Sequence, residues 1–233
     1  MKWKHAIVVG GSSGIGAELV RLLVADGCRV ACVARRTCPI DEALSFQHDV
    51  RNAQEVPSLF QKITGELGGL DLVIYAAGVM PRIGLEEFDT AKDLEILETN
   101  FAGAVVWLNQ AAIRFKNVGS GTIVGIGSVA GERGRRGQPV YNSSKGAVAT
   151  YLEALRNRLH GRGVTVVTIK PGPVETEMTA GLELKGAMNK TEAARKILRL
   201  SSRAGEHYLK VAHRLAFGVI RHIPGSIFRR LKI

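Results

Sequence analysis

Short apolar segments rich in β-branched residues alternate along this chain with longer segments whose apolar residues recur at helical spacing. Residues 6–9 form the first apolar run, a glycine pair follows it, and residues 16–26 have the apolar spacing of a helix packed on a sheet. The same alternation predicts strands at 29–34, 44–48, 71–75, 122–126, 164–169 and 207–211, and helices at 53–67, 90–116, 140–159 and 191–203. Near-continuous apolar strands joined by helical crossovers favour an α/β fold, a doubly wound parallel sheet of about seven strands with helices on both faces.

The sequence shows no division into several domains. It has 233 residues, no linker rich in Ser, Pro or Gly, and no internal repeat. Its 45% hydrophobic and 23% charged residues are ordinary for a globular protein and exclude a disordered or fibrous one. We therefore expect a single body over residues 1–205. A C-terminal extension over 206–233, with an edge strand and an amphipathic tail, would belong to the same domain or lie at its periphery.

Hydropathy and cysteine usage favour a cytoplasmic protein. No apolar stretch is long enough to span a membrane, and the run at 6–9 is too short for a signal peptide. The cysteines Cys28, Cys32 and Cys38 are odd in number and lack the spacing of a zinc site. We interpret them as reduced thiols and expect no metal.

The net charge of +11 is concentrated at the C-terminal end, because residues 195–233 hold 10 of the 32 basic residues and only 1 of the 21 acidic ones. Apolar residues between 211 and 223 recur at roughly helical spacing, and Ser226 is a candidate cap for a short helix over 227–233. A basic amphipathic segment suits peripheral contact with an anionic membrane; packing on the body or on a partner subunit is the alternative. No motif that reads nucleic acid is present, so we expect no nucleic-acid partner.

A glycine-rich turn, Gly10-Gly11-Ser12-Ser13-Gly14-Ile15-Gly16, lies between the first strand and the first helix. Glycines let the backbone approach a pyrophosphate, and the following helix offers N–H groups and the positive end of its dipole. No lysine follows the last glycine, so a triphosphate loop is disfavoured. Arg35 and Arg36 end the second strand, where a site for NAD usually presents an acid. Two guanidiniums suit the 2′-phosphate of NADP(H); solvated surface arginines are the alternative.

Tyr141 and Lys145 are four residues apart in a predicted helix, so the phenol and the ammonium share one helix face. A free tyrosine has a pKa of about 10 and is a poor acid–base catalyst at neutral pH. A neighbouring ammonium favours the phenolate and moves the pKa toward the working range. Alone, this spacing is common by chance, and a surface pair is the default interpretation.

In combination these motifs resemble the short-chain dehydrogenase/reductase family, a single-domain Rossmann-like group of NAD(P)(H) oxidoreductases. The resemblance covers residues 5 to about 176. It rests, besides the Tyr141–Lys145 pair, on Gly10, Gly14 and Gly16, on Asp49-Val50 after the third strand, on Ala76-Ala77-Gly78, on Asn100, on Ser128, and on Pro171-Gly172-Pro173-Val174-Glu175-Thr176.

The resemblance implies an NADP(H)-dependent enzyme that interconverts a carbonyl and an alcohol of a small molecule by hydride transfer. Tyr141 would exchange the proton with the carbonyl oxygen, and Ser128 would hydrogen-bond the same oxygen. Lys145 would hold the nicotinamide ribose and lower the tyrosine pKa, and Asn100 would hold a water that links Lys145 to solvent. The residues implied to bind the cofactor are Gly10, Ser12, Ser13, Gly14, Ile15, Gly16, Arg35, Arg36, Asp49, Val50, Ala76, Ala77, Gly78, Asn100, Tyr141, Lys145, Pro171, Gly172, Val174 and Thr176. A homodimer or tetramer that pairs through the helices at 91–116 and 140–159 is also implied.

The chain departs from the family pattern at three places. Val9 stands where the family usually has threonine, and Tyr75-Ala76 replace a frequent Asn-Asn pair, so two side-chain braces are expected to be lost. The basic tail replaces the usual glycine-rich C-terminal ending. A catalytically idle NADP-binding sensor or scaffold is the alternative function, which the intact Ser128, Tyr141 and Lys145 oppose.

Two segments are expected near the substrate. The loop 132–139 carries three arginines that would attract an anionic substrate, with a solvated loop as the alternative. Residues 177–190 match the family's substrate lid, where Met178, Leu182 and Leu184 face either an apolar substrate group or the protein core.

Overall fold

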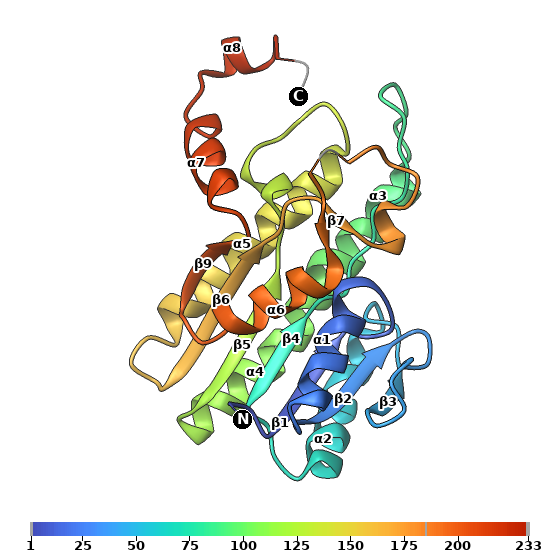
Figure 1. The fold of residues 1–233 in the computed structure, drawn as a ribbon, viewed down its shortest axis with the longest axis vertical. Coiled ribbons are helices and arrows are strands. Elements are labelled where there is room, and N and C mark those ends of the chain that lie inside the picture. Colours follow the sequence, from blue (N-terminus) through green and yellow to red (C-terminus); the bar gives the residue numbers. More distant parts are fainter. Residues whose placement is uncertain (1, 185, 232–233) are drawn as a thin grey trace.

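A seven-stranded parallel sheet forms the centre of the computed structural model, which describes residues 2–184 and 186–231. Its strand order is β3-β2-β1-β4-β5-β6-β9 (Figure 1). The strands are β1 (His5–Val9), β2 (Arg29–Ala34), β3 (Leu44–Gln47), β4 (Leu72–Tyr75), β5 (Gly121–Ile126), β6 (Val164–Lys170) and β9 (Gly205–Tyr208). The order reverses between β1 and β4, and the crevice at such a switch point is where parallel α/β sheets bind ligands.

Helices cover both faces of the sheet, as the sequence predicted. The helices on one face are α1 (Gly14–Ala25) and α6 (Lys190–Leu200), and those on the other are α2 (Val56–Leu67), α4 (Gly103–Val118) and α5 (Pro139–Arg158). Alternation along β1 explains the two layers. Ala6 and Val8 pack with α1 and α6, whereas Ile7 and Val9 pack with α2, α4 and α5.

The helical region expected over 90–116 is divided. It consists of α3 (Thr90–Leu97), a π-helical turn over Glu98–Ala102, and α4. The π turn widens the backbone at Asn100, and such turns are frequent at functional sites. The sequence analysis, which expected one continuous helical region, did not predict this turn.

The C-terminal end differs from the sequence expectation in detail. The last strand is β9, which adds to β6 in parallel at the edge of the sheet, so the extension begins inside the sheet. It continues as α7 (Val211–Ile220) and the one-turn α8 (Gly225–Phe228). Ser226 lies within α8, and Pro224 takes the capping position that we had assigned to Ser226. Residues 232–233 of the helix expected over 227–233 lie outside the described residues.

Cys28, Cys32 and Cys38 are buried with free thiols, as the sequence predicted. Burial raises the pKa of the Cys28 thiol to about 12, so that group stays protonated and unreactive at neutral pH. Within the described part of the chain, no helix has the length and apolar character that a membrane span requires.

Candidate active site

The glycine turn after β1 is shaped by backbone contacts that only glycine allows. Gly10 has a φ of 88°, and a Cβ there would lie 2.4 Å from the backbone nitrogen of Ala77. A Cβ on Gly16 would lie 2.0 Å from the carbonyl oxygen of Gly10. The turn therefore folds tightly against the end of β4 and the start of α1. Ser13, at the N-cap of α1, makes no side-chain capping bond. This leaves the first amides of the helix for a ligand.

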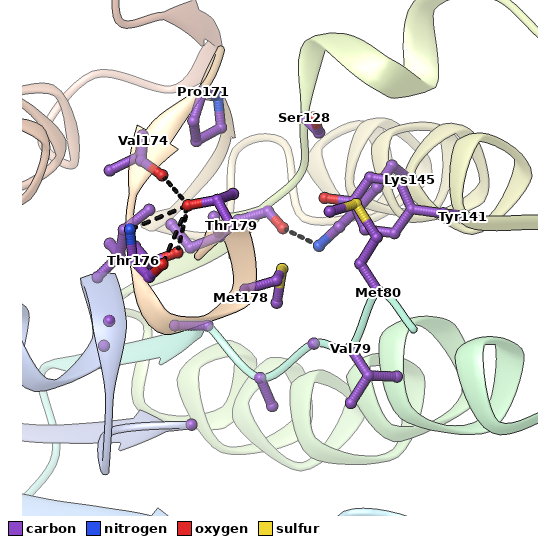
Figure 2. A pocket seen from close by; sticks show the side chains of 18 of the residues that line it. Val79, Met80, Ser128, Tyr141, Lys145, Pro171, Val174, Thr176, Met178 and Thr179 are labelled. Atoms are coloured by element: carbon purple, nitrogen blue, oxygen red, sulfur yellow. Dashed lines mark hydrogen bonds between the residues drawn. The ribbon is translucent and has the colours of Figure 1, made fainter. Parts of the chain in front are cut away.

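One cavity of about 710 Å³ extends from this turn across the ends of the central strands. It is lined by every site residue that the sequence singled out except Asn100. Its wall includes the glycine turn, Arg35 and Arg36, Asp49-Val50, Ala76-Ala77-Gly78, Ser128, Tyr141, Lys145 and the segment from Pro171 to Thr176. Segments far apart in the sequence thus meet in one site, part of which Figure 2 shows.

Charged side chains distinguish one end of this cavity. Arg35 and Arg36 follow β2 and are exposed along its wall. Asp49 is paired with Arg51, whose Nη2 lies 2.6 Å from its Oδ2. The Arg51 hydrogen bonds hold the pKa of Asp49 at about 2, so the carboxylate is ionised at neutral pH. This end offers both cations and an ionised acceptor.

Tyr141 and Lys145 lie on one face of α5, and Ser128 comes from the end of β5. The Lys145 ammonium lies 5.7 Å from the centroid of the Tyr141 ring. Its Nζ donates a hydrogen bond of 3.0 Å to the Ile126 carbonyl oxygen. Ser128 caps the following turn, and its Oγ accepts a hydrogen bond of 3.0 Å from the Ala130 amide. Figure 2 shows Ser128, Tyr141 and Lys145 at the same side of the cavity.

Burial is the main influence on the protonation of Tyr141 and Lys145. Burial raises the pKa of Tyr141, and the Ser128 hydroxyl and the Arg135 guanidinium oppose that rise only in part. Burial also lowers the pKa of Lys145 to about 8. Arg135 is the cation that lowers the pKa of Tyr141 here, and the effect of Lys145 on that pKa stays a prediction. At neutral pH the phenol keeps its proton.

Asn100 is buried behind the cavity. Its Oδ1 accepts a hydrogen bond of 2.7 Å from the Val79 amide, and its Nδ2 donates to the Val79 carbonyl at 3.0 Å and to Ser144 Oγ at 3.2 Å. A Cβ on Gly78 would lie 3.3 Å from Asn100 Oδ1 and 3.5 Å from Lys145 Nζ. Asn100 thus fixes the loop after β4 beside Lys145.

The three arginines of the loop 132–139 have three different surroundings. Arg133 is bonded to the C-terminal segment, with its Nη1 donating to the Ile220 carbonyl at 2.7 Å. Arg135 lines the cavity, and Arg136 is exposed. The loop ends at Gln138, whose φ of 57° is unusual for a residue other than glycine. Gln138 also lines the cavity, although no sequence pattern pointed to it.

The segment 177–190 covers the cavity, and Met178, Leu182 and Leu184 all line it. This favours the interpretation in which they face a ligand. The Thr179 hydroxyl holds the start of the segment, because its Oγ1 donates to the Val174 carbonyl at 2.7 Å and accepts from the Thr176 amide at 3.0 Å. Lys185, within this segment, lies outside the described residues.

Comparison with known proteins agrees with this geometry. A family model described as short chain dehydrogenase matches residues 4–186. The chain is 34% identical over 191 residues to an uncharacterised oxidoreductase from Myxococcus xanthus, covering 77% of this chain and 76% of that protein. It is 31% identical over 222 residues to a human 3-oxoacyl-[acyl-carrier-protein] reductase, covering 92% and 90%.

The chain belongs to the short-chain dehydrogenase/reductase family. The fold agrees, since a crystal structure of a short chain dehydrogenase from Burkholderia cenocepacia in complex with NADP superposes with a TM-score of 0.85. That match covers 100% of this chain and 99% of the other at 21% sequence identity. This likeness supports the Rossmann-like fold that the motifs implied.

At one departure from the family pattern, a different side-chain hydrogen bond takes the place of the one that was expected to be lost. Tyr75, in place of asparagine, is buried, and its hydroxyl donates a hydrogen bond of 2.5 Å to the Thr99 carbonyl in the π turn. A Cβ on Gly103 would lie 2.5 Å from that hydroxyl, so Gly103 makes the room for Tyr75. Val9, in place of threonine, is fully buried in the core.

The far end of this short-chain dehydrogenase contributes residues that the sequence did not reveal. His213 and Phe217 of α7 line the cavity, although α7 lies beyond the matched residues 4–186. A Cβ on Gly172 would lie 2.0 Å from the His213 ring, so α7 packs directly on the segment after β6. The sequence analysis expects the apolar residues of this tail at a membrane or a packing surface, and it did not predict that His213 and Phe217 line the cavity.

Proposed function

We propose that this protein is an NADP(H)-dependent oxidoreductase that interconverts a carbonyl and an alcohol. The observation that carries the proposal is the position of Ser128, Tyr141 and Lys145 on one wall of a cavity whose other end is the glycine turn. A catalytically idle sensor would have no need to keep this constellation intact.

The residues present fit a dinucleotide. Gly10 and Gly16 let the turn pack closely on Ala77 and on itself, and the first amides of α1 receive no side-chain cap and stay available to a phosphate. Arg35 and Arg36 favour NADP(H), because guanidiniums form charge-assisted hydrogen bonds with a phosphate. Lys145 and the segment from Pro171 to Thr176 would hold the nicotinamide end, where the reduced cofactor supplies the hydride.

Tyr141 acts as the general acid in carbonyl reduction. Its phenol is protonated at neutral pH because burial raises its pKa, so it has a proton to donate as charge develops on the carbonyl oxygen. The Ser128 hydroxyl donates a hydrogen bond to the same oxygen and stabilises that charge. The reverse reaction requires the phenolate and is therefore favoured at higher pH.

The test removes the Tyr141 hydroxyl. We expect Tyr141→Phe to lower the rate of NADPH consumption over a panel of carbonyl compounds by about 10²–10⁴-fold while NADPH binding, measured by fluorescence titration, persists. Tyr151→Phe is the matched control. Tyr151 lies on the same helix, but its hydroxyl donates to Asn109 Oδ1 at 2.9 Å and does not line the cavity. More than a few per cent of activity in Tyr141→Phe, or equal losses in both variants, contradicts the assignment.

A second test addresses the cofactor. Arg35→Ser combined with Arg36→Ser removes both guanidiniums from the end of β2. We expect the preference for NADPH over NADH to fall by at least tenfold, because hydrogen bonds to charged groups contribute about 1.5–3 kcal/mol each. An unchanged preference contradicts the proposed 2′-phosphate site.

We also propose that the protein assembles as a homodimer or tetramer through its long helices. Leu94 and Leu97 on α3 and Ile113 on α4 are apolar and exposed, which supports this proposal. Sedimentation velocity of Ile113→Ser tests it, since loss of an interface side chain lowers the assembled fraction. A monomeric wild-type protein contradicts it.

A further inference from the structure

Helix α7 is apolar on two opposite sides. His213 and Phe217 face the cavity and the body. Val211, Leu215 and Val219, spaced by four residues, form a stripe on the outer side and are 75%, 68% and 67% exposed. An apolar face of a helix is ordinarily packed against another surface. The outer stripe, which we call the α7 stripe, therefore needs an occupant.

The helix that carries the stripe is bound firmly to the body. Arg133 donates to the Ile220 carbonyl at the end of α7, and its guanidinium lies 4.1 Å from the centroid of the Phe228 ring in α8. Arg221, just after α7, forms an ion pair with the buried Glu132. Burial opposes the ionisation of Glu132, but Lys170, Tyr208 and Arg221 hold its pKa below the usual range. The α7 stripe thus has a fixed orientation relative to the cavity.

The charges around the stripe indicate its occupant. No acidic residue occurs between 207 and 233. Arg214, Arg229 and Arg230 are exposed and form no ion pair with any residue that the structure describes. Exposed apolar side chains flanked by unpaired cations match the chemistry of an anionic bilayer surface, which takes up the apolar groups and attracts the cations.

The same end of the molecule carries further exposed apolar residues. Leu85 and Phe88, which is 92% exposed, lie on the loop between β4 and α3. In Figure 1 this loop extends from the end of the sheet where α7 and α8 also lie. Apolar groups at both sides of that end suit contact with one flat surface.

We propose that the α7 stripe and the cations around it dock this protein onto an anionic lipid surface. A second copy of the chain is the less suitable occupant. The stripe is one side chain wide and about 12 Å long, whereas a stable interface buries roughly 800 Å² per partner. If two copies of the chain paired through their α7 stripes about a two-fold axis, the unpaired arginines of both copies would also lie near one another.

Docking has a consequence for the substrate, which rests on the proposed function. The inner side of α7 forms part of the cavity wall through His213 and Phe217. With the stripe in the membrane, the cavity lies next to the lipid. The protein then takes apolar carbonyl compounds that are dissolved in the bilayer.

Co-sedimentation with vesicles tests the docking. Full-length protein is mixed with vesicles of phosphatidylcholine alone or of phosphatidylcholine with phosphatidylglycerol. We expect binding to the anionic vesicles only, decreasing as salt is added. Val219→Ser should lower the partition coefficient about tenfold, because burying a valine side chain contributes about 1.5 kcal/mol or more. Arg229→Gln with Arg230→Gln should lower it roughly 30-fold, at about 1 kcal/mol per cation.

Val118→Ser is the matched control. Val118 is 62% exposed at the end of α4, which lies at the other end of the molecule (Figure 1), so we expect no change in partition. Binding equal on both vesicle types, or unaffected by Val219→Ser, overturns the proposal. So does dissociation of an oligomer by Val219→Ser in sedimentation velocity, which would identify the stripe as a subunit interface.

An activity measurement tests the substrate consequence separately. Anionic vesicles should raise kcat/KM for a long-chain methyl ketone with wild-type protein but not with Val219→Ser. Vesicle binding without this increase overturns the consequence alone. Because sedimentation needs no turnover, failure of the oxidoreductase assignment in Tyr141→Phe leaves the docking result intact.

Discussion

The two ends of the cavity are built by different means. At the glycine turn the shape comes from backbone, with Gly10 and Gly16 packed against Ala77 and against each other. At the substrate end the wall comes from side chains of three distant segments, the loop 132–139, the segment 177–190 and α7. Backbone packing tolerates almost no change of residue. A wall of side chains can vary while the catalytic group stays in place, and this explains how one fold serves many substrates.

The largest effect should come from the backbone-built end. In Gly16→Ala the new Cβ would lie 2.0 Å from the Gly10 carbonyl oxygen, and neither atom belongs to a flexible side chain. We expect a loss of about 3 kcal/mol in the free energy of unfolding and no measurable NADPH binding. Urea denaturation and fluorescence titration measure the two effects.

The matched control is Gly65→Ala in α2, where a Cβ would meet nothing within 4 Å. It should stabilise the protein by up to about 1 kcal/mol, because alanine is the better helix former. If Gly16→Ala behaves like this control, the glycine turn is not set by close packing.

A second prediction concerns the brace that links β4 to the π turn. Gly103→Ala places a Cβ 2.5 Å from the Tyr75 hydroxyl and should cost about 1–3 kcal/mol of stability. Tyr75→Phe removes that hydroxyl and should cost about 1 kcal/mol, through the hydrogen bond lost to Thr99. The double variant should lose less stability than the sum of the two single losses. Without the Tyr75 hydroxyl, the new Cβ at position 103 has no atom to clash with there. Additive losses in urea denaturation would contradict the pairing of Tyr75 with Gly103.

The contrast between the two ends also explains what the sequence could predict. The parallel sheet, the helices on both of its faces and the position of the glycine turn follow from apolar periodicity and from the glycines that a tight turn requires. The Tyr75–Thr99 bond, the left-handed Gln138 and the cavity-facing His213 and Phe217 were not predicted. These features depend on contacts between residues that are far apart in the sequence. The spacing of residues along the chain does not predict such contacts.

The Tyr141 environment is an instructive case. The spacing of Tyr141 and Lys145 correctly predicted one helix face, but it could not predict burial. Burial raises the pKa of Tyr141 and lowers that of Lys145 to about 8. The loop arginine that acts on the phenol, Arg135, comes from a segment where three arginines looked alike in the sequence.

A third prediction uses Lys145, which lies between the two ends. Its ammonium titrates with a pKa of about 8, so the charged donor is present below that pH and is lost above it. If the ammonium binds the cofactor, the dissociation constant of NADPH should rise about fivefold between pH 7 and pH 9. Tyr141→Phe should retain this pH dependence and Lys145→Met should lose it. The same dependence in Lys145→Met would assign the titration to another group.

The smallest effect should come from single side chains of the substrate end. Arg135 lowers the pKa of Tyr141, so Arg135→Gln should raise it further. Reduction needs the protonated phenol. The pH at which kcat/KM for reduction falls on the alkaline side should therefore increase. Oxidation needs the phenolate, so the pH at which kcat/KM for oxidation rises should also increase. Oxidation at neutral pH should therefore slow. Arg136→Gln is the control, because Arg136 is exposed and does not line the cavity. Equal shifts in both variants would mean that net charge acts on Tyr141 from a distance, and the side-chain wall would then have no specific part in setting its proton affinity.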